Sequence, residues 1–169
     1  GTTGWPKGVR LSYRAYETNA ATFESYLETE GAQLVNFIVN PMHHANSSAL
    51  TDWSLRRPGT RVVLLQRYTS AYWKALVDAV EQAPDRIVAP IVARHVDFLD
   101  SLANKGDLPV ERERLEQALE KVDFLIGSAP VGPKTVRRLV TFSKHLPLVR
   151  FGSTAVSYTH LRAHETNSN

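Results

Sequence analysis

The sequence predicts an α/β protein, in which alternating βα units form a mainly parallel sheet. Short apolar runs alternate with longer segments in which apolar residues recur every three or four positions. Strand-like and helix-like segments alternate at least four times along the chain. Such alternation is typical of parallel strands joined by right-handed helical crossovers.

The expected strands comprise the end of a strand at 9–11 and then the runs 34–39, 61–65, 87–89, 122–126 and 146–151. The expected helices lie at about 13–30, 47–57, 71–81, 91–102, 110–121 and 133–144. Ser12 and Ser70 can cap the helices that follow them, and Gly31 is expected to end the first helix. Pro90 is expected to begin the helix at 91. The run 61–65 reads as a buried strand, and 110–121 as a charged, solvated helix.

Composition bounds the function. With 169 residues, 43% hydrophobic and 22% charged, the chain is long enough for one core and too mixed for disorder. The net charge of +3 comes from interspersed charges, so no basic stripe indicates a nucleic-acid partner. Cysteine is absent, which excludes disulfides and thiolate metal sites. No apolar run approaches the ~18 residues of a membrane span. We therefore expect a cytoplasmic protein without a transmembrane segment.

The first eight residues, Gly1-Thr2-Thr3-Gly4-Trp5-Pro6-Lys7-Gly8, have a composition suited to phosphate. Glycines allow backbone N–H groups to approach an anion, and hydroxyls and an ammonium add hydrogen bonds and charge. The spacing does not fit the Walker loop, because Lys7 is followed by Gly8 rather than Ser or Thr. On composition alone, a flexible turn that holds a lysine explains this stretch equally well.

Three further loops follow predicted strands, at 40–46, 127–130 and 152–154. The carboxyl ends of parallel strands meet at one edge of a sheet, where ligands bind, so these loops should converge there. Taken singly, each has an ordinary reading. His43 and His44 fit a surface or packed pair, and 127–130 fits a strand-to-helix turn. A metal site is not expected, because adjacent histidines rarely converge on one ion.

The first loop resembles the phosphate-loop signature of the adenylate-forming superfamily, (S/T)-S-G-T-T-G-x-P-K-G, from Gly1 onward. This superfamily includes acyl-CoA synthetases, firefly luciferase and nonribosomal peptide adenylation domains. Residues 40–46 are similar to its P-x-x-H segment, 127–130 to its G-G/S-A-P segment, and 151–154 to its Y-G-x-T-E motif, in the family's order. The chain begins inside the first signature, so we expect a fragment of the large N-terminal domain that spans 1–155.

The resemblance implies an ATP-dependent ligase. A carboxylate attacks the α-phosphorus of ATP, pyrophosphate leaves, and a thiol such as that of coenzyme A then takes the acyl group. The implied catalytic residues are Lys7, on the β- and γ-phosphates, and Thr154, on the α-phosphate. His44 and Asn46 would border the small-molecule carboxylic acid. The other implied nucleotide-binding positions are Thr2, Thr3, Gly4, Gly8, Ser128, Ala129, Pro130, Phe151 (stacked on adenine), Gly152 and Ser153.

One position departs from the family pattern. Ala155 stands where the Y-G-x-T-E motif has the glutamate that holds Mg²⁺, so no metal ligand is assigned in this sequence. From 156 to 166 the chain resembles a translated tagmentation adaptor used in DNA sequencing, and every codon of that adaptor fits. The adaptor's leading CT, after a G, completes an alanine codon, and glutamate codons also start with G. We therefore expect a native glutamate at 155 and a non-native tail at 156–169, against the alternative of a natural polar tail.

The family's second adenylation lysine lies in a C-terminal domain that is absent from this chain, so the chain itself is expected to be inactive. Two alternatives remain. One is a non-catalytic nucleotide-binding α/β module, which would bind nucleotide without acid-dependent exchange of pyrophosphate. The other is a structural α/β domain with a chance Gly-Thr loop, for which Lys7→Ala would change nothing measurable.

Overall fold

The computed structural model describes residues 8–82, 84–128, 130–153 and 157–161, with only the backbone described at 151, 153 and 157–161. The first-loop residues Thr2, Thr3, Gly4 and Lys7 lie outside the described residues, as do Ala129, Thr154 and Ala155. The predictions for these seven positions therefore stay predictions.

The centre of the molecule is a six-stranded sheet in the order β2-β1-β3-β4-β5-β6. The first five strands run parallel, and β6 joins the edge of β5 in the antiparallel direction. The predicted α/β class with a mainly parallel sheet is confirmed. In chain order the strands are β1 (Leu34–Ile38), β2 (Thr60–Leu64), β3 (Arg86–Ile91), β4 (Val122–Ile126), β5 (Leu148–Ser153) and β6 (Ser157–Leu161).

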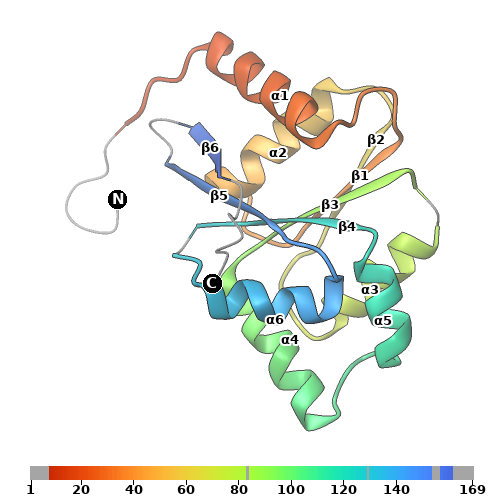
Figure 1. Ribbon diagram of the computed structural model, residues 1–169. Coiled ribbons are helices and arrows are strands. Elements are labelled where there is room, and N and C mark those ends of the chain that lie inside the picture. Colours follow the sequence, from red (N-terminus) through yellow and green to blue (C-terminus); the bar gives the residue numbers. More distant parts are fainter. Residues whose placement is uncertain (1–7, 83, 129, 154–156, 162–169) are drawn as a thin grey trace, which may run out of the picture.

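Helices cover both faces of the sheet and make three layers (Figure 1). On one face lie α1 (Tyr13–Leu27) and α2 (Ala45–Arg56). The other face carries α3 (Ala71–Glu81), α4 (Ala93–Lys105), α5 (Arg112–Leu119) and α6 (Pro133–Ser143). Because side chains alternate along a strand, the central strands contribute to a core on each face.

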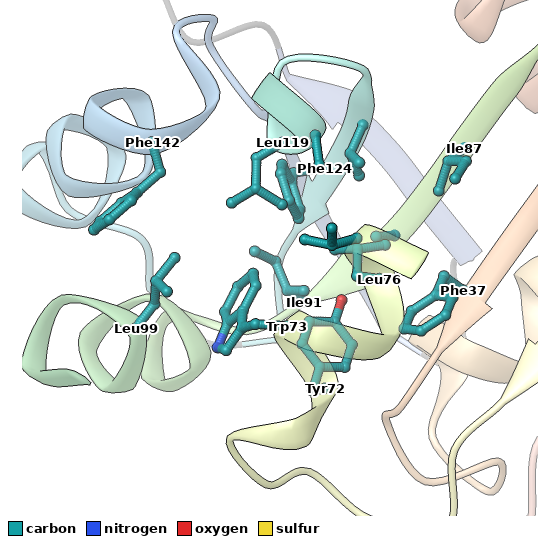
Figure 2. Packing of buried hydrophobic residues seen from close by; sticks show 14 of the residues in the cluster. Phe37, Tyr72, Trp73, Leu76, Ile87, Ile91, Leu99, Leu119, Phe124 and Phe142 are labelled. Atoms are coloured by element: carbon teal, nitrogen blue, oxygen red, sulfur yellow. The ribbon is translucent and has the colours of Figure 1, made fainter. Parts of the chain in front are cut away.

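The larger core lies under α3, α4, α5 and α6 (Figure 2). Phe37 of β1 and Phe124 of β4 face it, together with Trp73 of α3, and all three are 1% exposed or less. The smaller core lies under α1 and α2, where Phe23 packs on Trp53 with ring centroids 5.3 Å apart. Removal of this apolar surface from water is the main force that holds the layers together.

Local sequence explains several boundaries. Ser12 caps α1, since its hydroxyl oxygen accepts the backbone N–H of Ala15 at 3.2 Å. The expected side-chain cap at Ser70 was wrong, because Ser70 has helical backbone angles and makes no capping hydrogen bond with its side chain. The helix ends at Glu28, which adopts the left-handed conformation with φ 50°, three residues before Gly31. Gly106 ends α4 at φ 75°, a conformation that costs glycine little. Pro133 occupies the first turn of α6, where its missing N–H costs no helical bond.

The structure corrects the expectation for Pro90, which lies in β3 rather than at a helix start. The backbone N–H of Arg86, in the same strand, donates to the carbonyl of Gln33 beside β1. Backbone N–H groups alternate between the two neighbouring strands, so position 90, like 86 and 88, is directed toward β1. The ladder between β1 and β3 stops at Val88, so the N–H that Pro90 lacks removes no ladder bond. The following helix α4 begins at Ala93.

Other expectations were wrong in smaller ways. Residues 9–11 are not a strand. Strand β2 is half-buried rather than buried, because it has only β1 as a neighbour, and its Leu64 is 55% exposed. Helix α5 is shorter than 110–121 and buries Leu115 and Leu119, so it is not solvated all round. Strand β5 begins two residues later than expected. Strand β6 was not predicted.

Candidate functional site

The described parts of the predicted loops meet at one edge of the sheet. Strands β1, β3, β4 and β5 are parallel, so the residues after β1, after β4 and at the end of β5 lie at a common carboxyl edge (Figure 1). Two contacts join them across the sheet: Arg150 of β5 donates to Asn46 of α2, and Gly127 packs on the backbone of Arg150. The expected convergence is thus confirmed for these residues.

The loop after β1 is fixed by hydrogen bonds at its base. Asn40 donates its side-chain N–H to the carbonyl of Pro90 at 3.0 Å, and Ser47 Oγ donates to the carbonyl of Asn40 at 2.9 Å. His44 is the N-cap residue of α2, its side chain is exposed, and its Nδ1 accepts the N–H of Asn46 at 3.5 Å. The loop therefore presents the His44 ring to solvent at the carboxyl edge.

Asn46 occupies a different environment from His44. Its side chain is fully buried, and its Oδ1 accepts a hydrogen bond of 3.0 Å from Arg150 Nη1. Arg150 is itself only 3% exposed, and its guanidinium lies 4.8 Å from the ring centroid of Phe23, in cation–π contact. The two predicted acid-binding residues are thus close in sequence but only His44 is at the surface of the described chain.

The loop after β4 has a tight backbone. A Cβ on Gly127 would lie 2.7 Å from the carbonyl oxygen of Arg150, so glycine is required there for β4 and β5 to pack. Ser128 follows with φ 73°, an uncommon conformation for a residue with a side chain. Ser128 and Pro130 are exposed. The ligand role of this loop stays a prediction.

A cleft of about 460 Å³ opens at the same edge, on the face of α3 and α4. Its walls come from the ends of β1 and β2 and from the start of α4: Val39, Asn40, Pro41, Met42, Leu64, Leu65, Gln66, Arg67, Tyr68 and His95. Arg67 is exposed and makes no ion pair within the described parts of the chain. The cleft is therefore apolar inside with a cation at its surface.

Tyr68 and His95 make one wall of this cleft. Their rings stack with centroids 3.9 Å apart, and Tyr68 Oη donates to the His95 carbonyl at 3.1 Å while it accepts from Trp73 Nε1 at 2.8 Å. Burial, together with the positive charge of Arg94, lowers the pKa of His95 to about 4. Burial raises the pKa of Tyr68. Both rings are therefore uncharged near neutral pH.

The remaining predicted nucleotide positions are only partly described. Gly8 is exposed, and a Cβ there would meet nothing within 4 Å. Phe151, Gly152 and Ser153 form the end of β5. Among the described residues, no three histidine or acidic side chains are placed to bind a metal ion, and no helix could cross a membrane.

Sequence reasoning missed Arg150, Tyr68 and His95. Arg150 carried a signal, because it is a charged residue inside the otherwise apolar run 146–151, directly before Phe151. Such a residue is buried only when it has partners. Tyr68 and His95 carried no signal, since the contact between them depends on how α4 returns to the sheet.

The fold just described is that of an α/β protein with a mainly parallel sheet, in which the segments after β1 and β4 and the end of β5 lie at one edge. The family model for AMP-binding enzymes matches residues 1–167, and the chain belongs to that family. A comparison with curated protein sequences gave no match.

Similar solved structures agree on the fold. A malonyl-CoA ligase with methylmalonyl-CoA and AMP bound has a TM-score of 0.77 and 21% identity, over 96% of this chain and 33% of that one. ATP-bound MatB from Rhodopseudomonas palustris has a TM-score of 0.69 and 21% identity, over 94% and 28%. O-succinylbenzoate coenzyme A synthetase from Bacillus subtilis, with ATP and magnesium, has a TM-score of 0.63 and 19% identity, over 89% and 27%. The chain thus spans about a third of these proteins or less.

Proposed function

We propose that this chain is the part of an ATP-dependent carboxylate–coenzyme A ligase that carries its nucleotide loops and one wall of its acid site. The observation that supports this most is the convergence at the carboxyl edge: the segments around His44, Gly127 and Phe151 each resemble a family motif and lie together there. The likeness to the malonyl-CoA ligase and to O-succinylbenzoate coenzyme A synthetase favours coenzyme A as the thiol acceptor.

In the proposed reaction, a carboxylate oxygen of the acid attacks the α-phosphorus of ATP, and the bond to the bridging oxygen breaks to release pyrophosphate. The thiol of coenzyme A then attacks the acyl carbon, and AMP leaves. The protein supplies position and charge. Lys7 with Thr2, Thr3, Gly4 and Gly8 holds the β- and γ-phosphates, and Thr154 the α-phosphate. Ser128, Ala129, Pro130, Phe151, Gly152 and Ser153 surround adenine.

The acid approaches along the His44 loop, and the neighbouring cleft offers room for its carbon chain. The exposed Arg67 and the absence of an acidic side chain from the cleft's lining favour an anionic ligand. Mg²⁺ would neutralise phosphate charge during pyrophosphate loss. The sequence has no carboxylate between 151 and 155. Its protein ligand is proposed to be a glutamate at the position that is Ala155 here.

The test is ATP–pyrophosphate exchange by the longer protein that contains this chain, assayed with a panel of carboxylic acids. We expect acid-dependent exchange that Lys7→Ala lowers by about 100-fold, because the lysine neutralises phosphate charge in the transition state. Lys105→Ala, at an exposed side chain in the last turn of α4, is the matched control and should leave the rate unchanged. Nucleotide binding without exchange would instead favour a non-catalytic nucleotide-binding module.

Two narrower proposals accompany this one. The chain alone is proposed to be inactive, and acyl-adenylate formation by the purified 169 residues would contradict that. Residues 156–169 are proposed to be adaptor-derived, although the family match extends to 167 and 157–161 pair with β5. Adaptor-free sequencing of the source locus decides the second proposal: a glutamate codon at 155 supports it, and Ala155 followed by the same tail contradicts it.

A further inference from the structure

A buried arginine connects β5 with α2, the helix that follows a strand that is not a neighbour of β5 in the sheet. Strands β3 and β4 lie between β1 and β5, yet Arg150 of β5 reaches Asn46 at the start of α2, 104 residues away in sequence. The hydrogen bond from Nη1 to Oδ1 is 3.0 Å long and buried. Arg150 therefore links β5 to the start of α2, beside the edge at which the predicted ligand loops meet.

Each of the three loops depends on the position of Arg150. The His44 loop is tied to it through Asn46, two residues further on. The Gly127 loop packs on its carbonyl oxygen so closely that no Cβ fits. The third segment is continuous with Arg150, because Phe151 and Gly152 follow it directly in β5.

The surroundings of Arg150 explain why its position is well defined. Arginine keeps its charge when buried, so a buried guanidinium must be held by its contacts. Here it lies over the ring of Phe23 in α1 and donates to a carboxamide in α2. These contacts fix its side chain between the two helices on that face. A planar group with several donors is also restricted to few orientations.

We propose that Arg150 is a positioning residue that holds the His44 loop in register with β5, and so holds the acid beside the α-phosphate of ATP. It acts through Asn46 and does not itself touch the acid or the nucleotide. This inference rests on the proposed function for its kinetic consequence, whereas the mechanical connection between Arg150 and the His44 loop stands independently of it.

The chain offers a matched control in Arg57, which is also buried between α1 and α2. Its side chain is 8% exposed, its Nε lies 2.8 Å from Glu24 Oε1, and its Nη2 donates to the carbonyl of Ala32 at 2.7 Å. Arg57 follows the last residue of α2, at the opposite edge of the sheet from His44. Loss of either guanidinium removes contacts that involve α1 and the same face of the sheet, but only Arg150 lies at the candidate site.

The first measurement is hydrogen exchange of the longer protein, which needs no catalytic activity. Arg150→Met should speed exchange of the backbone amides of 42–48 by about tenfold, the factor that loss of a hydrogen bond to a charged group supplies. Asn46→Leu, which removes the acceptor instead, should do the same even if Arg150→Met folds poorly. Arg57→Met should leave these amides unchanged. Equal exchange of 42–48 in all four proteins would overturn the proposal.

The second measurement is acid-dependent pyrophosphate exchange. Arg150→Met should lower kcat or raise KM for the acid by about 10–100-fold, the effect of a small displacement of a reacting group, with ATP affinity within about twofold. Arg57→Met should leave both constants unchanged. Combining Arg150→Met with His44→Ala should cost no more than His44→Ala alone, because Arg150 acts through that loop. Fully additive losses, or equal losses in both arginine variants, would contradict the positioning role. If the wild type shows no exchange, the proposed function fails, and hydrogen exchange still decides the connection.

Discussion

Two clefts of similar volume open at opposite edges of the sheet. The carboxyl-edge cleft, beside the His44 loop, measures about 460 Å³, and the amino-edge cleft about 420 Å³. The second is lined by Val80, Pro84, Asp85, Arg86, Ile87, Glu120, Lys121 and Asp123. By size alone, either cleft would serve as a candidate site.

Charge pairing separates the two edges. At the amino edge, Arg86 pairs with Asp123 at 2.6 Å, and Asp85 accepts the backbone N–H of Gln33 at 2.6 Å. At the carboxyl edge, Arg67 is exposed and has no ion pair within the described parts of the chain. Arg86 and Asp123 of the amino edge therefore neutralise each other, whereas the charge of Arg67 at the carboxyl edge is available to an anionic ligand.

The largest expected effect comes from removing the support of the carboxyl-edge cleft. Trp73 is fully buried and donates to Tyr68 Oη, so Trp73→Ala should lower the free energy of unfolding by about 3–5 kcal/mol. Urea unfolding followed by circular dichroism measures this. Leu55→Ala, at a side chain that is 79% exposed, should change stability by less than about 0.5 kcal/mol. Equal effects of the two substitutions would contradict the described packing of α3.

The buried histidine of the same cleft predicts a pH dependence of stability. The pKa of His95 is lowered from 6.5 to about 4, so between these values the unfolded chain binds a proton that the folded chain does not. The free energy of unfolding is therefore unaffected by this histidine above pH 6.5 and decreases as the pH falls toward 4, by on the order of 3 kcal/mol. We therefore expect the free energy of unfolding of the wild type to fall more steeply than that of His95→Asn as the pH falls from 6.5 to 4. Above pH 6.5 the two pH dependences should be parallel. Parallel curves throughout would contradict a neutral, buried His95.

Two glycines allow the tight packing of the carboxyl edge to be separated from simple backbone strain. Gly127→Ala should cost about 2 kcal/mol, because its Cβ would meet the Arg150 carbonyl at 2.7 Å. Gly106→Ala should cost about 1 kcal/mol from its positive φ alone, since a Cβ there meets nothing within 4 Å. Only Gly127→Ala should also speed hydrogen exchange in β5. Unchanged exchange in that variant would show that β4 and β5 tolerate the extra methyl group.

The smallest effect is expected at the amino edge. Asp123→Asn removes the ion pair with Arg86, whose side chain is 35% exposed, and should cost no more than about 1 kcal/mol. It should leave nucleotide binding by the longer protein unchanged, as measured by equilibrium dialysis with ATP. A loss of ATP affinity in this variant would contradict our proposal that the nucleotide binds at the carboxyl edge.

Local patterns predicted the elements well wherever sequence signals bracket them. Helix α3 has the expected bounds, although Ser70 makes no side-chain cap, because its apolar face has a clear helical period, and β4 coincides with its apolar run. Pro90 misled the prediction, since local rules favour a helix start and only the end of the β1–β3 ladder explains its place in a strand. The Arg150–Asn46 contact could not be predicted from local patterns. The two residues are 104 positions apart, and only the strand order of the sheet brings them together. The motif resemblance located His44 and the Gly127 loop, but not the residue that connects them.

The central claim is that the carboxyl edge, and not the amino edge, binds the nucleotide. Hydrogen exchange of the longer protein with and without ATP and Mg²⁺ tests it directly. We predict slower exchange in 127–128, 152–154 and 42–48 when ATP is present, with 84–87 and 119–123 unchanged. Protection confined to the amino edge, or no protection at either edge at saturating ATP, would contradict the account.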